Sequence, residues 1–313
     1  MKFKEKSVQI PHKSVLLKET IEVFQNIHEG YIVDCTVGYG GHSEAILKQN
    51  DHIKMICIDR DSQAIEFSKR RLKPFEDRVV FVQGRFAQVI NRYKDFPIKG
   101  VLADIGVSSL QLDSNERGFG FNSNTLDMRM DSSQSLSAKD VINYYSLEKL
   151  ENIFKEYGEI REYKKVASLI VNRREKKLFE SSIEFSNFIA KHLTNRKKIH
   201  PATLVFQAIR IEVNNELEEL KKLLDSIQNL HIHKCLVAII SFHSLEDKIV
   251  KQTFKRWQKS CVCDENVLKC VCGNNHSIGK VLTKKPIVPK GEEIENNPRS
   301  RSSKLRVFKI DRR

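Results

Sequence analysis

The sequence predicts an α/β fold, a doubly wound sheet with an all-helical domain inserted into it. Four apolar runs alternate with helical patterns and predict parallel strands, at 31–33, 53–58, 78–83 and 100–105. The alternation stops between 111 and 204, where the chain becomes charged and helical in period. A fully apolar run at 234–242 then resumes the sheet. We therefore expect residues 1–110 and 205–313 to form one discontinuous domain and residues 111–204 to form a second.

A glycine-rich turn follows the first of these strands, in the stretch YIVDCTVGYGGHS (31–43). It contains Gly38, Gly40 and Gly41 and leads into a helical pattern at Ser43. Glycines let the backbone approach a ligand closely, and a helix start offers unpaired N–H groups. Such a turn is typical of nucleotide-like ligands, although many strand-to-helix loops carry two glycines and bind nothing.

The second strand ends in Asp59, twenty-one residues beyond Gly38. At this distance a doubly wound nucleotide fold places the carboxylate that hydrogen-bonds a ribose. The dinucleotide fingerprint G-x-G-x-x-G also needs glycine or alanine at position 43, where this chain has Ser43. The need for a third glycine relaxes for a ligand that lacks phosphate, so these residues favour S-adenosylmethionine over NAD.

The run at 100–105 carries a third acid, Asp104. The carboxyl ends of parallel strands meet at one edge of a sheet, which favours a ligand site shared by Asp34, Asp59 and Asp104. The alternative is that each aspartate caps its own loop. Phe86 lies just past another strand end, where it either packs on an adenine face or belongs to the core.

The composition indicates a polyanionic partner. The chain has 313 residues, with 54 Lys and Arg against 40 Asp and Glu, a net charge of +14. This excess favours RNA or DNA, and the alternative is a general surplus of surface lysine. We expect no membrane association and a cytoplasmic location, because the first residues form no apolar signal core and no later run could span a bilayer. The seven cysteines are then expected as thiols.

The inserted region predicts three helices, at 147–157, 160–174 and 182–193. They and the following segment carry the densest bases in the chain, namely Arg161, Lys164, Lys165, Arg173, Arg174, Lys176, Lys177, Arg196, Lys197 and Lys198. These bases either contact RNA phosphates or keep exposed helices soluble.

A further helix begins at His200 and carries one polar stripe of Thr203, Gln207, Arg210 and Asn214. The stripe indicates either contact with a ligand or RNA, or hydrogen bonds that hold the two domains together. His243 follows the strand at 234–242 and is a site candidate, whereas Ser244 and Asp247 fit a helix N-cap and its third residue.

Four cysteines lie within twelve residues in the order C-x-C, six residues, C-x-C, at Cys261, Cys263, Cys270 and Cys272. Four thiols so close in sequence suit tetrahedral zinc. The usual knuckle spacing is C-x-x-C, however, so a cysteine-rich surface loop without metal stays open as the alternative.

Eight segments in this order carry a resemblance that runs nearly end to end: GYGGHS (38–43), IDRD (58–61), ADIGVSSLQLD (103–113), ERGFGF (116–121), LDMRMD (126–131), HPATLVFQAIRIEVNNEL (200–217), SFHSLEDKIVK (241–251) and NPRSRSSKLRV (297–307). Together they resemble the bacterial small-subunit ribosomal RNA cytosine-N4 methyltransferase family, the MraW type. The resemblance implies a class I (Rossmann-like) S-adenosylmethionine-dependent fold with an inserted helical substrate-recognition domain. It also implies methyl transfer to N4 of one cytidine in the decoding centre of 16S ribosomal RNA.

The family's cofactor positions fall on Gly40, Gly41, His42, Asp59, Phe86, Asp104 and Gln111. The implied partner is 16S ribosomal RNA or the small ribosomal subunit, and the oligomeric state is left open, a homodimer included. A cytosine N4 amine is a poor nucleophile, so an enzyme must accept its hydrogen bonds and align it. Asp104 is the first candidate for that acceptor, with neighbouring backbone carbonyls as alternatives.

Two other functions compete with this one. The first is a nicotinamide-dependent oxidoreductase on the same fold, against which Ser43 argues. The second is a non-catalytic RNA-binding or assembly factor, against which the intact Gly40, Gly41, Asp59 and Asp104 argue.

Overall fold

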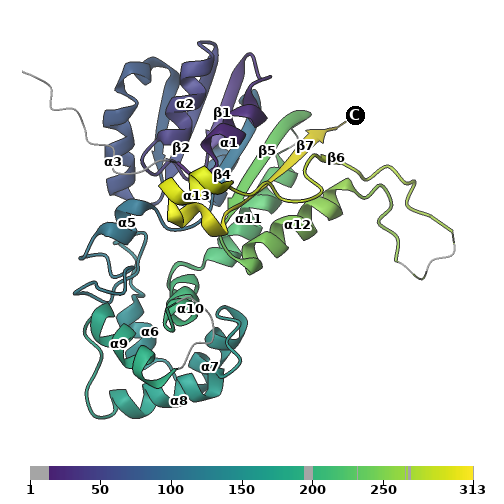
Figure 1. Cartoon of the computed structure of the whole chain (residues 1–313). Helices are drawn as coiled ribbons and strands as arrows, with labels where there is room; N and C mark the ends of the chain where they lie inside the picture. Colours follow the sequence, from purple (N-terminus) through teal and green to yellow (C-terminus); the bar gives the residue numbers. More distant parts are fainter. Residues whose placement is uncertain (1–13, 194–199, 231, 265, 267–268, 313) are drawn as a thin grey trace, which may run out of the picture. The chain divides into compact units, whose positions relative to one another are not determined.

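The computed structural model describes residues 14–193, 200–230, 232–264, 266 and 269–312 (Figure 1). The chain divides into two compact units, one formed by Met1–Gly106 with Glu219–Arg313 and the other by Val107–Glu218. That the first unit binds a cofactor and the second recognises a substrate stays a prediction. Among the described residues, every helix is too short or too polar to cross a bilayer.

The first unit contains a seven-stranded sheet in the order β3-β2-β1-β4-β5-β7-β6. Strands β1 to β5 are parallel, and β7 runs antiparallel to both β5 and β6. This is the sheet of the class I (Rossmann-like) methyltransferase fold, so the predicted fold class is confirmed. The strands are β1 (Gly30–Asp34), β2 (Ile53–Asp59), β3 (Val79–Gln83), β4 (Ile98–Asp104), β5 (Lys234–Ser241), β6 (Gly279–Val281) and β7 (Lys304–Asp311).

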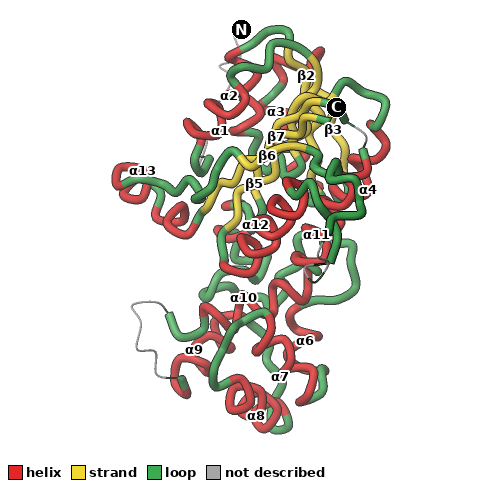
Figure 2. The backbone as a smooth tube through the Cα atoms, turned by 90° about the vertical axis from the view of Figure 1, so that its right-hand side faces the viewer, coloured by secondary structure: helices red, strands yellow, loops and turns green. Residues whose placement is uncertain are grey.

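Helices cover both faces of this sheet (Figure 2). Ile32 and Met55 belong to the core on one face, and the adjacent Val33 and Ile56 belong to the core on the other. Successive strand residues point to opposite faces, so strands buried on both sides must be apolar throughout. One face packs against α1 (Leu17–Phe24), α2 (Gly41–Gln49) and α3 (Ser62–Arg71), and the other against α4 (Phe86–Val89), α11 (Glu216–Asn229) and α12 (Ser244–Gln258).

The segment before β7 is rich in proline and basic residues, a composition that predicts an extended chain, but part of it is helical. Residues Gly291–Asn296 form a short helix, α13, and Pro298–Ser302 form a 3₁₀ turn. Glu293 on α13 accepts a hydrogen bond from the backbone N–H of Leu16 at 2.7 Å, which ties this segment to the start of α1. Two other 3₁₀ turns lie at Lys73–Arg78 and Ile90–Tyr93.

The second unit is helical around its own apolar core. Three of its helices match the three predicted in the inserted region, α10 matches the further helix predicted from His200, and the others are α5 and α6. Sequence periodicity missed α6, which is seven residues long and begins with a capping box between Ser137 and Asp140. The helices are α5 (Ser109–Asp113), α6 (Ala138–Tyr144), α7 (Leu147–Glu156), α8 (Tyr163–Arg174), α9 (Ser182–His192) and α10 (Thr203–Asn214).

Candidate functional site

The glycine-rich turn lies between β1 and α2, at the carboxyl edge of the parallel strands. Gly38 and Gly40 have φ of 50° and 74°, in the left-handed region that favours glycine. At Gly41 a Cβ would lie 2.1 Å from the hydroxyl oxygen of Ser14, so a side chain there requires Ser14 to move. The shape of the turn therefore depends most on Gly38 and Gly40, whose backbone conformation favours glycine.

Asp59, at the end of β2, holds this turn in place. Its Oδ2 accepts a hydrogen bond from the backbone N–H of Gly38 at 3.0 Å, and its Oδ1 accepts one from Asp61 at 2.9 Å. Burial raises the pKa of Asp59 to about 6, against the two hydrogen bonds, which lower it. A carboxylate oxygen can accept more than one hydrogen bond, so Asp59 keeps acceptor capacity for a ligand.

Asp34 and Ser43 form a buried pair beneath the turn. The Ser43 hydroxyl donates to Asp34 Oδ2 at 2.6 Å, while Asp34 Oδ1 accepts from the backbone N–H of Thr36 at 3.2 Å. Only 2% of Asp34 is exposed, so it anchors the loop from inside. Both oxygens of Asp34 are thus used by the protein itself, as are both oxygens of Asp59. Ser43, at the third position of the dinucleotide fingerprint, has a structural partner.

Asp104 ends β4 beside the same turn. Its Oδ1 is buried and has no hydrogen-bond partner within the described part of the chain. Its Oδ2 lies 3.9 Å from Nδ1 of His42, whose Nε2 is 2.9 Å from the carbonyl oxygen of Val15. Burial, and then the negative charges of Asp34 and Glu246, raise the pKa of Asp104 to about 8. A positively charged ligand beside Asp104 would favour its ionised form.

The two remaining predicted cofactor positions differ in their surroundings. Phe86 is 9% exposed and packs in the core with residues such as Val33 and Ile56, so its observed role is packing and its adenine contact stays a prediction. Gln111 belongs to the second unit, where its Oε1 accepts a hydrogen bond from the backbone N–H of Ser108 at 3.1 Å.

His243 is the N-cap of α12, and the predicted cap at Ser244 is wrong by one residue. The backbone N–H of Glu246 donates to His243 Nδ1, and Glu246 Oε2 accepts from the backbone of Phe242 at 2.9 Å. Glu246 is fully buried and adds a negative charge near Asp104. The sequence did not indicate the cap at His243 or its partner Glu246, because serine is a commoner N-cap residue than histidine.

The polar stripe on α10 makes its hydrogen bonds inside the second unit. Gln207 donates to the Tyr157 carbonyl oxygen at 3.1 Å, and Asn214 donates to the Met128 carbonyl oxygen at 2.7 Å. Arg210 forms two hydrogen bonds of 2.9 Å with Glu216. These three residues of the stripe therefore stabilise the helical unit, and contact of the stripe with a ligand or RNA stays a prediction.

The basic residues of the helical unit fall into two groups. Arg173 pairs with Glu184 at 2.6 Å, and Arg174 donates to the carbonyl oxygens of Ile142 and Tyr145, so both arginines hold the unit together. The exposed group comprises Arg161, Lys164, Lys165, Lys176 and Lys177. The predicted bases at 196–198 lie outside the described residues.

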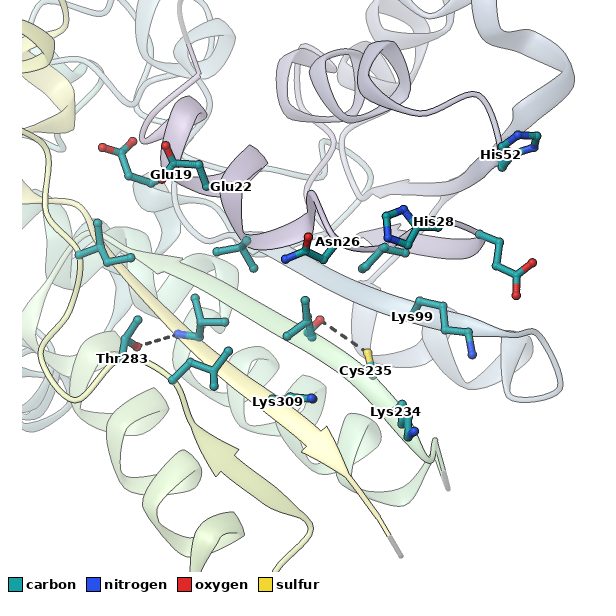
Figure 3. Close-up of a pocket in the computed structure, with 17 residues that line it drawn as sticks. Glu19, Glu22, Asn26, His28, His52, Lys99, Lys234, Cys235, Thr283 and Lys309 are labelled. Atoms are coloured by element: carbon teal, nitrogen blue, oxygen red, sulfur yellow. Dashed lines mark hydrogen bonds between the residues drawn. The ribbon is translucent and has the colours of Figure 1, made fainter.

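A hollow of about 1050 Å³ lies on the first unit between α1 and strands β5 and β7 (Figure 3). Lys234 and Cys235 at the start of β5 and Lys99 near the start of β4 line it. These are the amino ends of parallel strands, whereas the glycine turn and Asp104 lie at the carboxyl ends. The hollow is therefore separate from the candidate cofactor site.

Comparison with known proteins decides the family. The model of the MraW methylase family matches residues 9–311. The chain belongs to the MraW methylase family. The "Ribosomal RNA small subunit methyltransferase H" of Aliarcobacter butzleri is 60% identical over 304 residues, which cover 97% of this chain and 100% of that protein. Proteins of the same name are 53% identical in a Sulfurovum species, over 97% of this chain and 99% of the relative, and 54% identical in Helicobacter pylori, over 96% and 97%.

Membership in the MraW methylase family agrees with the family resemblance found in the sequence. It supports a methyl-donor site at the carboxyl edge of the sheet, where open α/β sheets bind their ligands. The roles of Gly40, Gly41, His42, Asp59 and Asp104 in that site stay predictions.

Proposed function

We propose that this protein transfers a methyl group from S-adenosylmethionine to N4 of a cytidine in the decoding centre of 16S ribosomal RNA. The small-subunit ribosomal RNA substrate is supported by the names of relatives that are 53% to 60% identical over nearly the whole chain. The observation that carries the chemistry is the carboxylate of Asp104, with a buried oxygen that has no partner among the described residues.

The charge of the site fits S-adenosylmethionine better than a dinucleotide. Asp34, Asp59, Asp104 and Glu246 place four carboxyl groups at one strand edge, and burial raises the pKa of the three aspartates, so further negative charge is unfavourable there. A pyrophosphate would add two more negative charges to this edge, whereas a sulfonium and an ammonium group would neutralise part of it. Ser43 agrees with this choice, because its hydroxyl fills the space where the dinucleotide fingerprint needs a third glycine.

The protein would bind the methyl donor with the glycine turn and Asp59. The turn brings backbone close to the ligand, and Asp59 offers its spare acceptor capacity to ribose hydroxyls. When bound, the donor supplies an electrophilic methyl group. All other steps depend on how the protein positions the acceptor base.

Asp104 would accept a hydrogen bond from the N4 amine of the target cytidine. An acceptor at Oδ1 draws electron density toward N4 and can take its proton as the new N–C bond forms. The base must leave its stack to reach this edge, as in other enzymes that modify bases. The proposed amine chemistry needs no cysteine nucleophile, and burial raises the pKa of the Cys35 and Cys57 thiols.

Methyl transfer from radiolabelled S-adenosylmethionine tests this proposal. The protein is incubated with naked 16S RNA, free small subunits and whole ribosomes, and the product is digested to nucleosides. We expect label in N4-methylcytidine. Label in C5-methylcytidine, or in no nucleoside of any of the three substrates, would reject the proposal.

The variant Asp104→Asn belongs in the same experiment. The amide cannot take a proton, so we expect methyl transfer to fall by at least about tenfold while RNA binding is retained. Asp77→Ala removes an exposed carboxylate elsewhere in the first unit and serves as a control that should transfer at the wild-type rate.

A further inference from the structure

The cysteine-rich segment between α12 and β6 brings its four sulfur atoms together. Figure 1 shows this segment extending away from the sheet. The sulfurs of Cys261, Cys263, Cys270 and Cys272 all lie within 4.8 Å of one another, although six residues separate the two C-x-C pairs. A surface loop that binds nothing does not require its four thiols to meet at one point.

The distances between the sulfurs match those around a tetrahedral ion. Cys270 Sγ lies 3.6 Å from Cys261 Sγ and 3.5 Å from Cys272 Sγ, and the Cys261 and Cys272 sulfurs are 3.7 Å apart. Zinc–sulfur bonds of about 2.3 Å in a tetrahedron place the sulfurs about 3.8 Å apart. A disulfide would require about 2.05 Å instead. These three sulfurs therefore already stand close to tetrahedral spacing, and the sulfur of Cys263 lies within 4.8 Å of each of them.

Backbone hydrogen bonds support two of the four sulfurs, those of Cys272 and Cys263, in a reciprocal pattern. The N–H of Val262, in the first C-x-C, donates to Cys272 Sγ at 3.4 Å. The N–H of Val271, in the second C-x-C, donates to Cys263 Sγ at 3.4 Å. Donors aimed at sulfur stabilise thiolates and orient metal ligands, so the two middle residues act as an outer layer of the site.

Apolar packing does not hold this segment. The side chains of Val262 and Val271 are 57% and 82% exposed, and neither belongs to a core of the described residues. Two backbone hydrogen bonds of 3.0 Å close its base, from Ile278 to Trp257 and from His276 to Ser260. A segment that buries so little apolar surface needs a cross-link or a metal to keep one conformation.

We propose that Cys261, Cys263, Cys270 and Cys272 bind one structural Zn²⁺ ion. The four thiolates complete a tetrahedron and leave no open position, so the ion would order the segment and take no part in methyl transfer. The proposal is independent of the proposed reaction, since it rests on sulfur geometry outside the candidate cofactor site. Of the two alternatives that the C-x-C spacing left open, it adopts the metal site.

Metal analysis of the full-length protein, purified with reductant and without chelator, tests the proposal. We expect about one zinc per chain. Cobalt substitution should give the intense visible bands of tetrahedral Co²⁺ and thiolate-to-metal charge transfer. Cys261→Ser and Cys272→Ser should each lower the zinc content severalfold, whereas Cys235→Ala, which changes a thiol buried in the core, should retain it.

Proteolysis gives a second measurement that does not depend on the variants folding well. Removing zinc from the wild-type protein with a chelator should speed tryptic cleavage at Lys259 or Lys269, and adding Zn²⁺ back should slow it again. A metal-free preparation that takes up no zinc from solution, or a thiol count showing a disulfide under reducing purification, would overturn the proposal.

Discussion

At the scale of single residues, Asp104 is the most informative group in the first unit. Its side chain is 23% exposed, yet Oδ1 is buried, and the nearest charges of the protein are negative. Such a group costs free energy unless a ligand compensates for it. Sequence reasoning found Asp104 by its position at a strand end, and the structure adds the reason why it needs a partner.

The raised pKa of Asp104 predicts how stability depends on pH. The folded protein binds this proton with a pKa of about 8, against the ordinary value of 3.8 in the unfolded chain. Between these values the folded state holds more protons, so the free energy of unfolding should fall as pH rises from about 4 to about 8. Asp34 and Asp59 act in the same direction up to about pH 6.

Asp104→Asn should flatten this dependence between about pH 6 and pH 8, because the amide does not titrate. Chemical denaturation of the wild type and the variant across this range, without cofactor, checks the expectation. S-adenosylmethionine should bind more tightly to the wild type as pH rises through the same range, because its positive charge favours the ionised carboxylate. Parallel pH profiles for the two proteins would contradict both statements.

Asp59→Ala should weaken S-adenosylmethionine binding by about 1–3 kcal/mol, the cost of leaving ligand hydroxyls without an acceptor. The change also frees the N–H of Gly38, so the glycine turn loses its tie to β2. Calorimetric titration measures the effect, and Asp77→Ala supplies the matched loss of one negative charge. Equal affinities for Asp59→Ala and wild type would remove Asp59 from the site.

At the scale of elements, the β1–α2 connection is stabilised from both sides. Asp34 holds it from below through Ser43, and Asp59 holds it from the neighbouring strand through Gly38. Gly38 and Gly40 can adopt the positive φ angles of the turn, and the hydrogen bonds of the two carboxylates stabilise that conformation. An anion-binding turn would instead present its free N–H groups to phosphate.

Ser43→Ala should destabilise the protein by about 1–3 kcal/mol, because it leaves a buried oxygen of Asp34 without its hydrogen-bond donor. Urea unfolding measures the loss, and Ser62→Ala, at an exposed position on α3, should change it little. Ser43→Gly restores the dinucleotide fingerprint but should gain no affinity for NAD, since the surrounding carboxylates stay. Measurable NAD binding by Ser43→Gly would show that the fingerprint alone sets the ligand.

At the scale of the whole molecule, some of the basic residues behind the net charge of +14 stabilise the fold, and the others are exposed. Arg306 is buried and pairs with Asp247 at 2.6 Å, and Arg173 and Arg174 stabilise the helical unit. The bases that remain for RNA are the exposed lysines and arginines, so tests of RNA binding should exclude the structural ones.

Replacing Arg161, Lys164 and Lys176 with alanine should weaken RNA binding and flatten its salt dependence, by about 0.7–0.9 in slope for each phosphate that the variant no longer binds. The base that is methylated should stay the same, since phosphate contacts position RNA without selecting sequence. Filter binding across salt concentrations measures both effects. The matched control replaces three exposed lysines of the first unit, Lys69, Lys73 and Lys94.

An unchanged salt slope in the triple variant would exclude these bases as the RNA-binding residues. The exposed arginines of the C-terminal segment, Arg299 and Arg301, would then be tested next. Arg174→Ala should behave differently from the triple variant, with a loss of stability, because two carbonyl oxygens lose their donor.

The sequence by itself determined the sheet, the inserted helical region and the family. Strands buried on both faces need continuous apolar runs, and the runs at 53–58, 100–105 and 234–242 each lie almost entirely within a strand. The acids at strand ends were equally visible. Short elements such as β6 and α6 were not predicted, because three to seven residues are too few to show a hydrophobic period.

Only the tertiary structure decided which polar residues serve the fold and which remain for a ligand. Asp34 and Asp104 look alike in the sequence, but Ser43 satisfies the first, whereas Oδ1 of the second has no partner within the described residues. The convergence of two C-x-C pairs onto one point was equally hidden. Hydrogen bonds and metal sites join residues far apart in the chain, and no local pattern records which distant groups will meet.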